Sequence, residues 1–239
     1  MEITEQSLRA LVAATDDEHR AGMGALPQQI AELHHGEGRT IVGHSRRQFM
    51  QRLGLTGLAV TIGSQLIPMR SLMPTSFAAD GDAGLAAFAE SVELAAVEAY
   101  KAAAGSGLVT TKGVLDAATT FAGHHTEHAA AFGAAAGSAA TKKPNPKLLA
   151  AVAGQLKGAK DQAAVLKIAF DLEGAAAATY LFALGALTSK SALQLTASIL
   201  PVEAQHAVVL GQVLGLTATD YVPSFETVTS AVNPTDYPI

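Results

Sequence analysis

Cysteine and tryptophan are absent from this chain of 239 residues. Without cysteine there are no disulfides, thiolate zinc sites or iron–sulfur clusters, so any bound metal must use oxygen and imidazole donors. Aromatic residues make up only 5% of the chain, and its hydrophobic content of 49% comes mostly from alanine and leucine. Such residues favour closely packed helices over strands. We therefore expect an all-α protein.

Positive charge is also scarce. The formal net charge is −5, and no arginine follows Arg70. The later lysines are scattered or paired at Lys142 and Lys143, so no basic stripe exists and nucleic acid is excluded as the main partner. The sequence also lacks a phosphate-binding glycine loop, a nucleophile elbow and a dinucleotide fingerprint, which argues against kinases and hydrolases.

Residues 44–79 have the pattern of a targeting segment. Ser45-Arg-Arg-Gln-Phe49 leads into a moderately apolar stretch that ends near Pro68, and Ser76-Phe-Ala78 follows. The segment resembles a twin-arginine export signal, which implies a protein of the periplasm or cell envelope. Cleavage after Ala78 would release the protein, whereas an uncleaved segment would associate it with the membrane. The alternative is a basic start to a buried core helix.

Residues 1–43 precede that segment and are expected to be partly helical or disordered. Apolar residues at helical intervals around Leu8 predict a short amphipathic helix. The pair His34-His35 lacks a set of carboxylates at ligand spacing, so we expect it to be exposed to solvent. An over-extended start codon would also account for this extension, and no function is predicted for it.

One pattern occurs twice in the rest of the chain. Glu93-Leu-Ala-Ala-Val-Glu-Ala-Tyr100 returns 80 residues later as Glu173-Gly-Ala-Ala-Ala-Ala-Thr-Tyr180. A second echo, at an offset of 78, matches His125-Thr-Glu-His128 to Glu203-Ala-Gln-His206. This is the pattern of a duplicated helix pair.

The pattern and its breakers predict four main helices, at residues 83–104, 111–136, 161–187 and 190–214. Short turns join the helices of each pair, whereas residues 137–160 form a long connection that is itself partly helical. One long crossover between two antiparallel hairpins is the ferritin-like arrangement of the four-helix bundle. We assign residues 80–216 to this domain and residues 217–239 to an irregular tail.

Metal-binding residue types recur at the matched positions of the repeat. Residues three or four apart share a helix face. His125 with His128 on the second predicted helix can therefore hold one ion, and Glu203 with His206 on the fourth can hold another. Glu173 and Glu203 lie in apolar surroundings with no lysine or arginine one turn away, and a metal ion is the natural counter-charge for a buried carboxylate. The candidate ligands are Glu93, His125, His128, Glu173, Glu203 and His206.

Other residues near these positions leave alternatives open. Helix two could instead use His124 with Glu127, although the alignment of the repeats favours His125 with His128. Tyr100 and Tyr180 could hydrogen-bond to the ligand carboxylates or serve only in aromatic packing. We expect Glu90, Glu98 and Asp171 to be solvated.

Residues 83–215 resemble the ferritin-like superfamily that includes rubrerythrins and bacterioferritins, particularly its exported bacterial branch with twin-arginine signals. The resemblance implies an iron site, with manganese or zinc as alternatives, and a homodimer. The superfamily's ligands correspond here to Glu93, His128, Glu173, Glu203 and His206. The departure is His125, because the superfamily has a bridging glutamate at that position.

These observations predict an exported metal-binding protein with an atypical di-metal site. Ferroxidase-like or oxygen- and peroxide-linked redox activity is the catalytic version of that hypothesis. His125 contributes no negative charge and bridges poorly as a neutral imidazole. The three carboxylates and three imidazoles could still hold two divalent ions, or one ion tightly and one loosely. The alternative is a non-catalytic helical bundle of the cell envelope whose metal site has degenerated, and a weaker third hypothesis is a helical partner-binding module.

Overall fold

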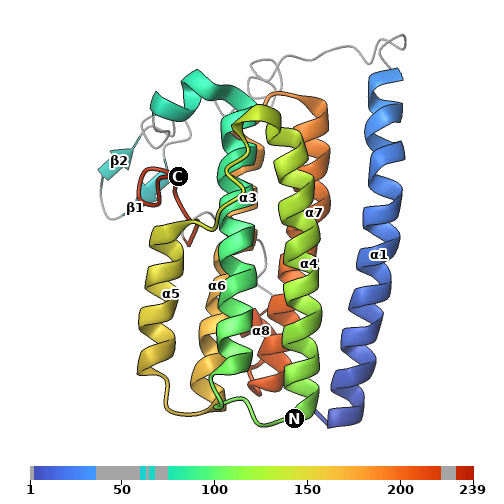
Figure 1. The fold of residues 1–239 in the computed structure, drawn as a ribbon, viewed down its shortest axis with the longest axis vertical. Coiled ribbons are helices and arrows are strands. Elements are labelled where there is room, and N and C mark those ends of the chain that lie inside the picture. Colours follow the sequence, from blue (N-terminus) through green and yellow to red (C-terminus); the bar gives the residue numbers. More distant parts are fainter. Residues whose placement is uncertain (1–2, 36–59, 63–64, 68–74, 222–229) are drawn as a thin grey trace.

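The computed structural model describes residues 3–35, 60–62, 65–67, 75–221 and 230–239. Four long helices form an antiparallel bundle (Figure 1): α3 Thr75–Gly105, α4 Lys112–Ala136, α6 Gln162–Ala186 and α7 Lys190–Val213. Three of them lie within one residue of the predicted bounds. The helix α3 begins earlier than predicted, and Gly81, with φ 60° and ψ −148°, kinks it before the bundle proper. The predicted all-α bundle is confirmed.

Two hairpins make up the bundle, as the repeat predicts. The helix α3 packs most extensively against α4, and α6 packs most extensively against α7. Between the hairpins lies α5 Pro146–Gly158, which packs against α3 and α6. The fully buried Asn145 fixes the start of α5, because its side chain accepts a hydrogen bond from the Leu148 N–H. The connection between the hairpins is therefore an ordered crossover.

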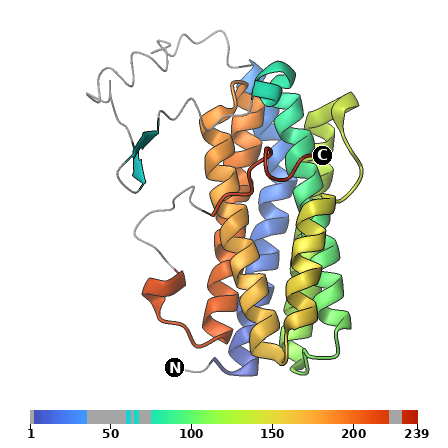
Figure 2. The same ribbon diagram turned by 90° about the vertical axis from the view of Figure 1, so that its left-hand side faces the viewer.

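A fifth long helix, α1 Glu5–His35, lies along the bundle against α4 and α7. Figure 2 shows it behind the bundle, on the side opposite α5. It has 31 residues, so the expected short helix was wrong in length. Its buried positions run from Leu8 through Thr15 and His19 to Leu26, and the polar residues in the middle interrupt the apolar periodicity that would have revealed the full helix.

The predicted export segment is described only in part. The strands β1 Val60–Ile62 and β2 Gln65–Ile67 pair in an antiparallel hairpin. The last residues of the segment form the start of α3. Arg46 and Arg47 lie outside the described residues, as do the side chains of His34 and His35. The export signal therefore stays a prediction.

The described parts of the tail lie against the bundle. The short helix α8 Ala218–Tyr221 contacts α7. Further on, the Val232 N–H donates to Thr179 Oγ1 at 2.7 Å, and Asn145 Nδ2 donates to the Tyr237 carbonyl at 2.9 Å. These bonds fix the last ten residues over α5 and α6, and α5 buries Leu148 and Val152 beside them.

The bundle core is divided along its length. One buried apolar cluster includes Phe121 and Val209, and a second includes Phe132 and Ile199. Residues of α1 belong to both clusters. Among the described helices, only α6 is long and apolar enough to cross a membrane by length and composition, and it is also a bundle helix with a buried carboxylate, Glu173.

Candidate metal centre

All six predicted ligand residues meet inside the bundle. They come from four helices: Glu93 from α3, His125 and His128 from α4, Glu173 from α6, and Glu203 and His206 from α7. Each is at most 1% exposed. The matched positions of the repeat therefore converge on one polar layer.

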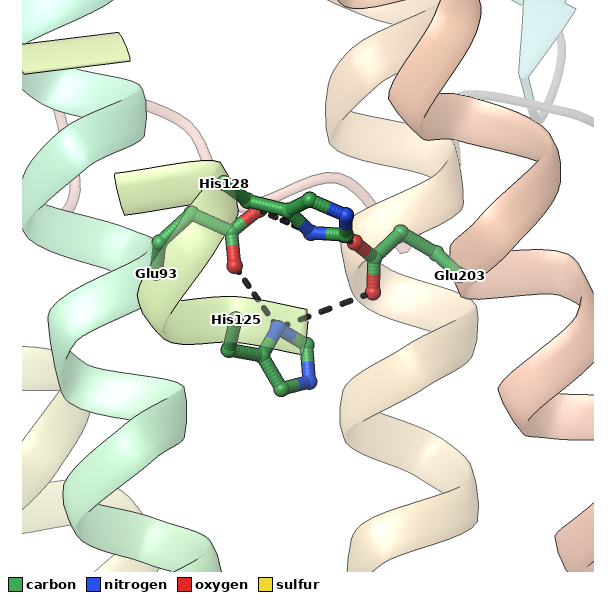
Figure 3. A group of neighbouring side chains, drawn as sticks. All are labelled: Glu93, His125, His128 and Glu203. Atoms are coloured by element: carbon green, nitrogen blue, oxygen red, sulfur yellow. Dashed lines mark hydrogen bonds and ion pairs between the residues drawn. The ribbon is translucent and has the colours of Figure 1, made fainter. Parts of the chain in front are cut away.

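The layer divides into two overlapping groups of four. Glu93, His125, His128 and Glu203 form the first group (Figure 3), and His125, Glu173, Glu203 and His206 form the second. Within each group, one donor atom from every residue lies within 4.8 Å of the others. His125 and Glu203 belong to both groups, so these two residues occupy the central, shared positions.

The His125 ring faces both groups. Its Nδ1 lies 2.7 Å from Glu93 Oε2, and its Nε2 lies 3.2 Å from Glu173 Oε1. Glu203 Oε2 is 3.8 Å from the same Nδ1. The His125 imidazole thus lies between the carboxylates of the two groups. At the matching position of the other repeat the chain has a carboxylate, Glu203.

His128 and His206 use the same ring nitrogen toward the centre. Nδ1 of His128 is 2.9 Å from Glu203 Oε1 and 3.6 Å from Glu93 Oε1. Nδ1 of His206 is 3.2 Å from Glu173 Oε2 and 3.6 Å from Glu203 Oε2. The two histidines therefore repeat in geometry as well as in sequence, with Nδ1 inward and Nε2 outward.

Two tyrosines hold the outer carboxylates, each across the bundle. The Tyr100 hydroxyl donates to Glu173 Oε1, and the Tyr180 hydroxyl donates to Glu93 Oε1. Burial, together with these carboxylates, raises the pKa of both phenols well above the ordinary value, so both remain donors. Of the two alternatives left open for these tyrosines, the structure shows the hydrogen bonds to carboxylates, which link the two halves because each tyrosine bonds the glutamate of the other repeat.

Electrostatics couples the carboxylates to the histidines. Burial alone would lower the pKa of His128, but Glu93 and Glu203 outweigh it and raise the pKa to about 9. The carboxylates likewise raise the pKa of His125 and His206 against the effect of burial. In return, His125 and His128 overcome burial and lower the pKa of Glu93 to about 2.

The site passes a simple test of fit for a metal ion. Both oxygens of Glu203 are buried, and the polar atoms closest to them are imidazole nitrogens, with Nδ1 of His128 at 2.9 Å. A buried carboxylate is costly without a counter-charge, and when the rings are neutral their lone pairs converge with those of Glu203, as a cation requires. The donor set of three carboxylates and three imidazoles suits divalent iron, manganese and zinc.

Four further residues lie behind the centre. His124 and Glu127, the alternative ligand pair on α4, lie outside both groups of four, and His124 instead contacts His206. From α1, Asp16 contacts His124 and His19 contacts His128. Nothing in the sequence marked the two α1 residues, because they follow no repeat and precede the domain.

Of the three acidic residues expected in solvent, two are exposed and one is buried. Glu98 and Asp171 are exposed and pair with Lys101 and Lys167, as expected. Glu90 is only 5% exposed, so that expectation was wrong. Its carboxylate accepts a hydrogen bond from the Thr141 N–H at 2.6 Å, which stabilises the turn after α4 and explains its burial.

The family model described as the ferritin-like domain matches residues 59–216 of the chain. The match covers α3 to α7 and all six residues of the centre, and α1 precedes it. No curated protein and no solved structure matches the chain.

Proposed function

The chain belongs to the ferritin-like domain family, and we propose that its buried centre binds two divalent first-row transition-metal ions, one of them more tightly. The single observation that carries this proposal is the arrangement of two four-residue donor groups around a shared, fully buried Glu203 whose oxygens face imidazole nitrogens. Glu93 and His128 would hold one ion, and Glu173 and His206 the other.

Iron is the metal that the family membership favours, with manganese and zinc as alternatives. Bound iron would supply ferroxidase-like or oxygen- and peroxide-linked redox chemistry. The residues of the chain would orient the ligands and restrict water, because Tyr100 and Tyr180 fix the outer carboxylates and the two apolar clusters enclose the polar layer. Catalytic turnover at this centre is part of the same proposal.

We further propose that the protein is exported by the twin-arginine route. The support is the sequence pattern at residues 44–79, and export of a folded protein would allow the metal to be loaded in the cytoplasm. An uncleaved segment would keep the protein at the membrane.

A second candidate function has its own supporting observation. Three buried carboxylates face three imidazoles whose pKa values are raised, so the cluster can balance its own charge without an ion. On this proposal the chain is a non-catalytic helical bundle of the cell envelope with a degenerate metal site. Metal analysis separates the two proposals.

The deciding experiment is elemental analysis of the full chain purified after expression in iron-, manganese- and zinc-supplemented medium. We expect about one to two equivalents of one divalent metal per chain, unchanged in a Glu98→Gln control that alters an exposed carboxylate. Less than about one-tenth equivalent in the wild-type protein, after attempted reconstitution with each ion, would support the degenerate bundle instead.

The raised pKa values of the histidines predict opposite pH trends for the metal-free and metal-bound proteins. In the metal-free protein, the raised pKa of His128 stabilises the fold fully below its unfolded value of 6.5, and this stability is lost as pH rises through about 9. The contribution is about 3 kcal/mol. Metal affinity should instead rise between pH 6 and 9, because Nδ1 must lose its proton to bind.

Thermal unfolding of the metal-free protein and zinc titration, each followed from pH 6 to pH 9, measure these trends. Metal affinity that stays flat over this range would contradict the assignment of the histidines as ligands.

A further inference from the structure

A second pair of histidines lies directly behind the two that face the centre with Nδ1. His19 Nε2 is 3.2 Å from His128 Nε2, and His124 Nδ1 is 2.9 Å from His206 Nε2. All four rings are buried. Each inner histidine therefore has its outward nitrogen engaged by another histidine, one from α1 and one from α4.

Carboxylates lie beyond the outer rings. Asp16 Oδ1 is 3.2 Å from His124 Nε2, and Glu127 Oε2 is 3.7 Å from His19 Nδ1. The His19 and His124 rings stack on each other, with centroids 3.9 Å apart and planes 19° apart. The result is two side-by-side chains of contacts, each running from a carboxylate near the surface through an outer histidine to an inner one.

The protonation pattern of these chains follows from their partners. Each outer ring is buried, with one nitrogen against an inner histidine and the other toward a carboxylate, an arrangement that a neutral imidazole satisfies. A neutral ring has one donor nitrogen and one acceptor nitrogen. If the outer rings accept from the inner Nε2–H groups, their remaining N–H groups point toward Glu127 and Asp16, and the inner Nδ1 atoms are left to face the centre.

We propose that α1 is a working part of the metal centre, in which His19 positions His128 directly and Asp16 positions His206 through His124. This inference rests on the proposed metal-binding function. A second hydrogen bond on a ligand histidine fixes its tautomer and ring orientation, and losing one typically costs about 10- to 100-fold in metal affinity. A direct positioning group for His128 and an indirect one for His206 thus come from a helix outside the residues matched to the family.

One consequence concerns the N-terminal extension. Cleavage after Ala78 would separate α1 from the bundle, so on this proposal residues 5–35 must stay attached to the domain or remain bound to it for the centre to keep its full affinity. The buried side chains Leu8, Val12 and Leu26 supply the packing that holds α1 in place.

The choice of variant matters because a cavity of about 330 Å³ between α1 and α7 adjoins both His19 and His128. A small residue at position 19 would admit water, which can replace the lost hydrogen bond. His19→Leu fills the space without an acceptor, whereas His19→Gln restores an acceptor oxygen. Leu8→Ala is the matched control, since it weakens the packing of α1 without touching either chain of contacts.

The test uses cobalt(II) titration of the full-length chain, followed by visible absorption. We expect His19→Leu to weaken cobalt binding about 10- to 100-fold and to shift the absorption bands, and His19→Gln to recover most of both. Leu8→Ala should lower the unfolding temperature and keep the wild-type bands. Wild-type affinity and bands in His19→Leu would overturn the inference.

A metal-free measurement separates this inference from the proposed function. In ring ¹⁵N spectra of histidine-labelled protein, we expect His19→Leu to shift the His128 signals, and Asp16→Leu to shift those of His124 and His206 but not His128. Unchanged ring signals would overturn the positioning role. If wild-type protein binds no cobalt, the proposed function fails, and these spectra still decide whether α1 orients the inner histidines.

Discussion

Replacing Glu203 by alanine is expected to reduce bound metal from one to two equivalents to below about one-tenth, the largest loss of any single substitution in the centre. Glu203 is the carboxylate common to both groups of four, so its removal takes an anionic ligand from each half at once. By contrast, Glu93→Ala and Glu173→Ala each remove a ligand from one half. We expect each to spare the opposite ion, which elemental analysis of the three variants measures directly.

The same variant should also be less stable than the wild-type protein when metal is withheld. Glu203 lies 2.9 Å from Nδ1 of His128 and raises the pKa of His125, His128 and His206, so its removal takes a counter-charge away from three buried rings and leaves a small cavity. We expect the metal-free unfolding temperature of Glu203→Ala to fall below that of the wild-type protein. Retention of two ions by Glu203→Ala would contradict the shared role, and Glu98→Ala provides the exposed control.

The repeat made most of the centre predictable. Because residues three apart share a helix face, His125 with His128 and Glu203 with His206 had to point together once the helices were identified. The length of the crossover then fixed two antiparallel hairpins, and this topology brings Glu93 and Glu173 to the same level. Local spacing and chain topology were sufficient for these six residues.

The other features of the site depend on contacts between residues far apart in the sequence, which no local pattern indicates. His19 lies 109 residues from His128 in the sequence, and α1 docks through buried residues spread along its whole length. The crossed hydrogen bonds of Tyr100 and Tyr180 required the relative rotation of the hairpins, because each tyrosine bonds the glutamate of the other repeat. Glu90 is buried because a distant turn supplies its donors. Such long-range partners are invisible to helical periodicity.

His125 breaks the symmetry that the repeat creates. The pseudo-equivalent position holds Glu203, so a fully symmetric centre would have two shared carboxylates, whereas this one has a carboxylate and an imidazole. Glu173, Glu203 and Glu93 raise the pKa of His125 well above the ordinary value despite burial. In the metal-free protein the ring is therefore a cation placed between the carboxylates that would hold the two ions, and it competes with metal for them.

His125→Glu is accordingly expected to bind two ions with similar affinities, whereas we expect the wild-type protein to bind one tightly and one weakly. The substitution removes a cation that contacts Glu93 and Glu173 and adds an anion that both ions can share. We expect the second ion to bind at least about 10-fold more tightly, measured by calorimetric titration with zinc.

The same substitution should destabilise the metal-free protein, because four buried carboxylates would then face only two of the original three imidazoles. Its unfolding temperature without metal should fall below that of the wild-type protein, and the rise on adding metal should be larger. His125→Gln is the matched control, since it removes the cation without adding an anion and should improve the second site less. Identical stepwise affinities in all three proteins would show that His125 is not the origin of the asymmetry, and the weaker half would then have to be traced to His206 or Glu173.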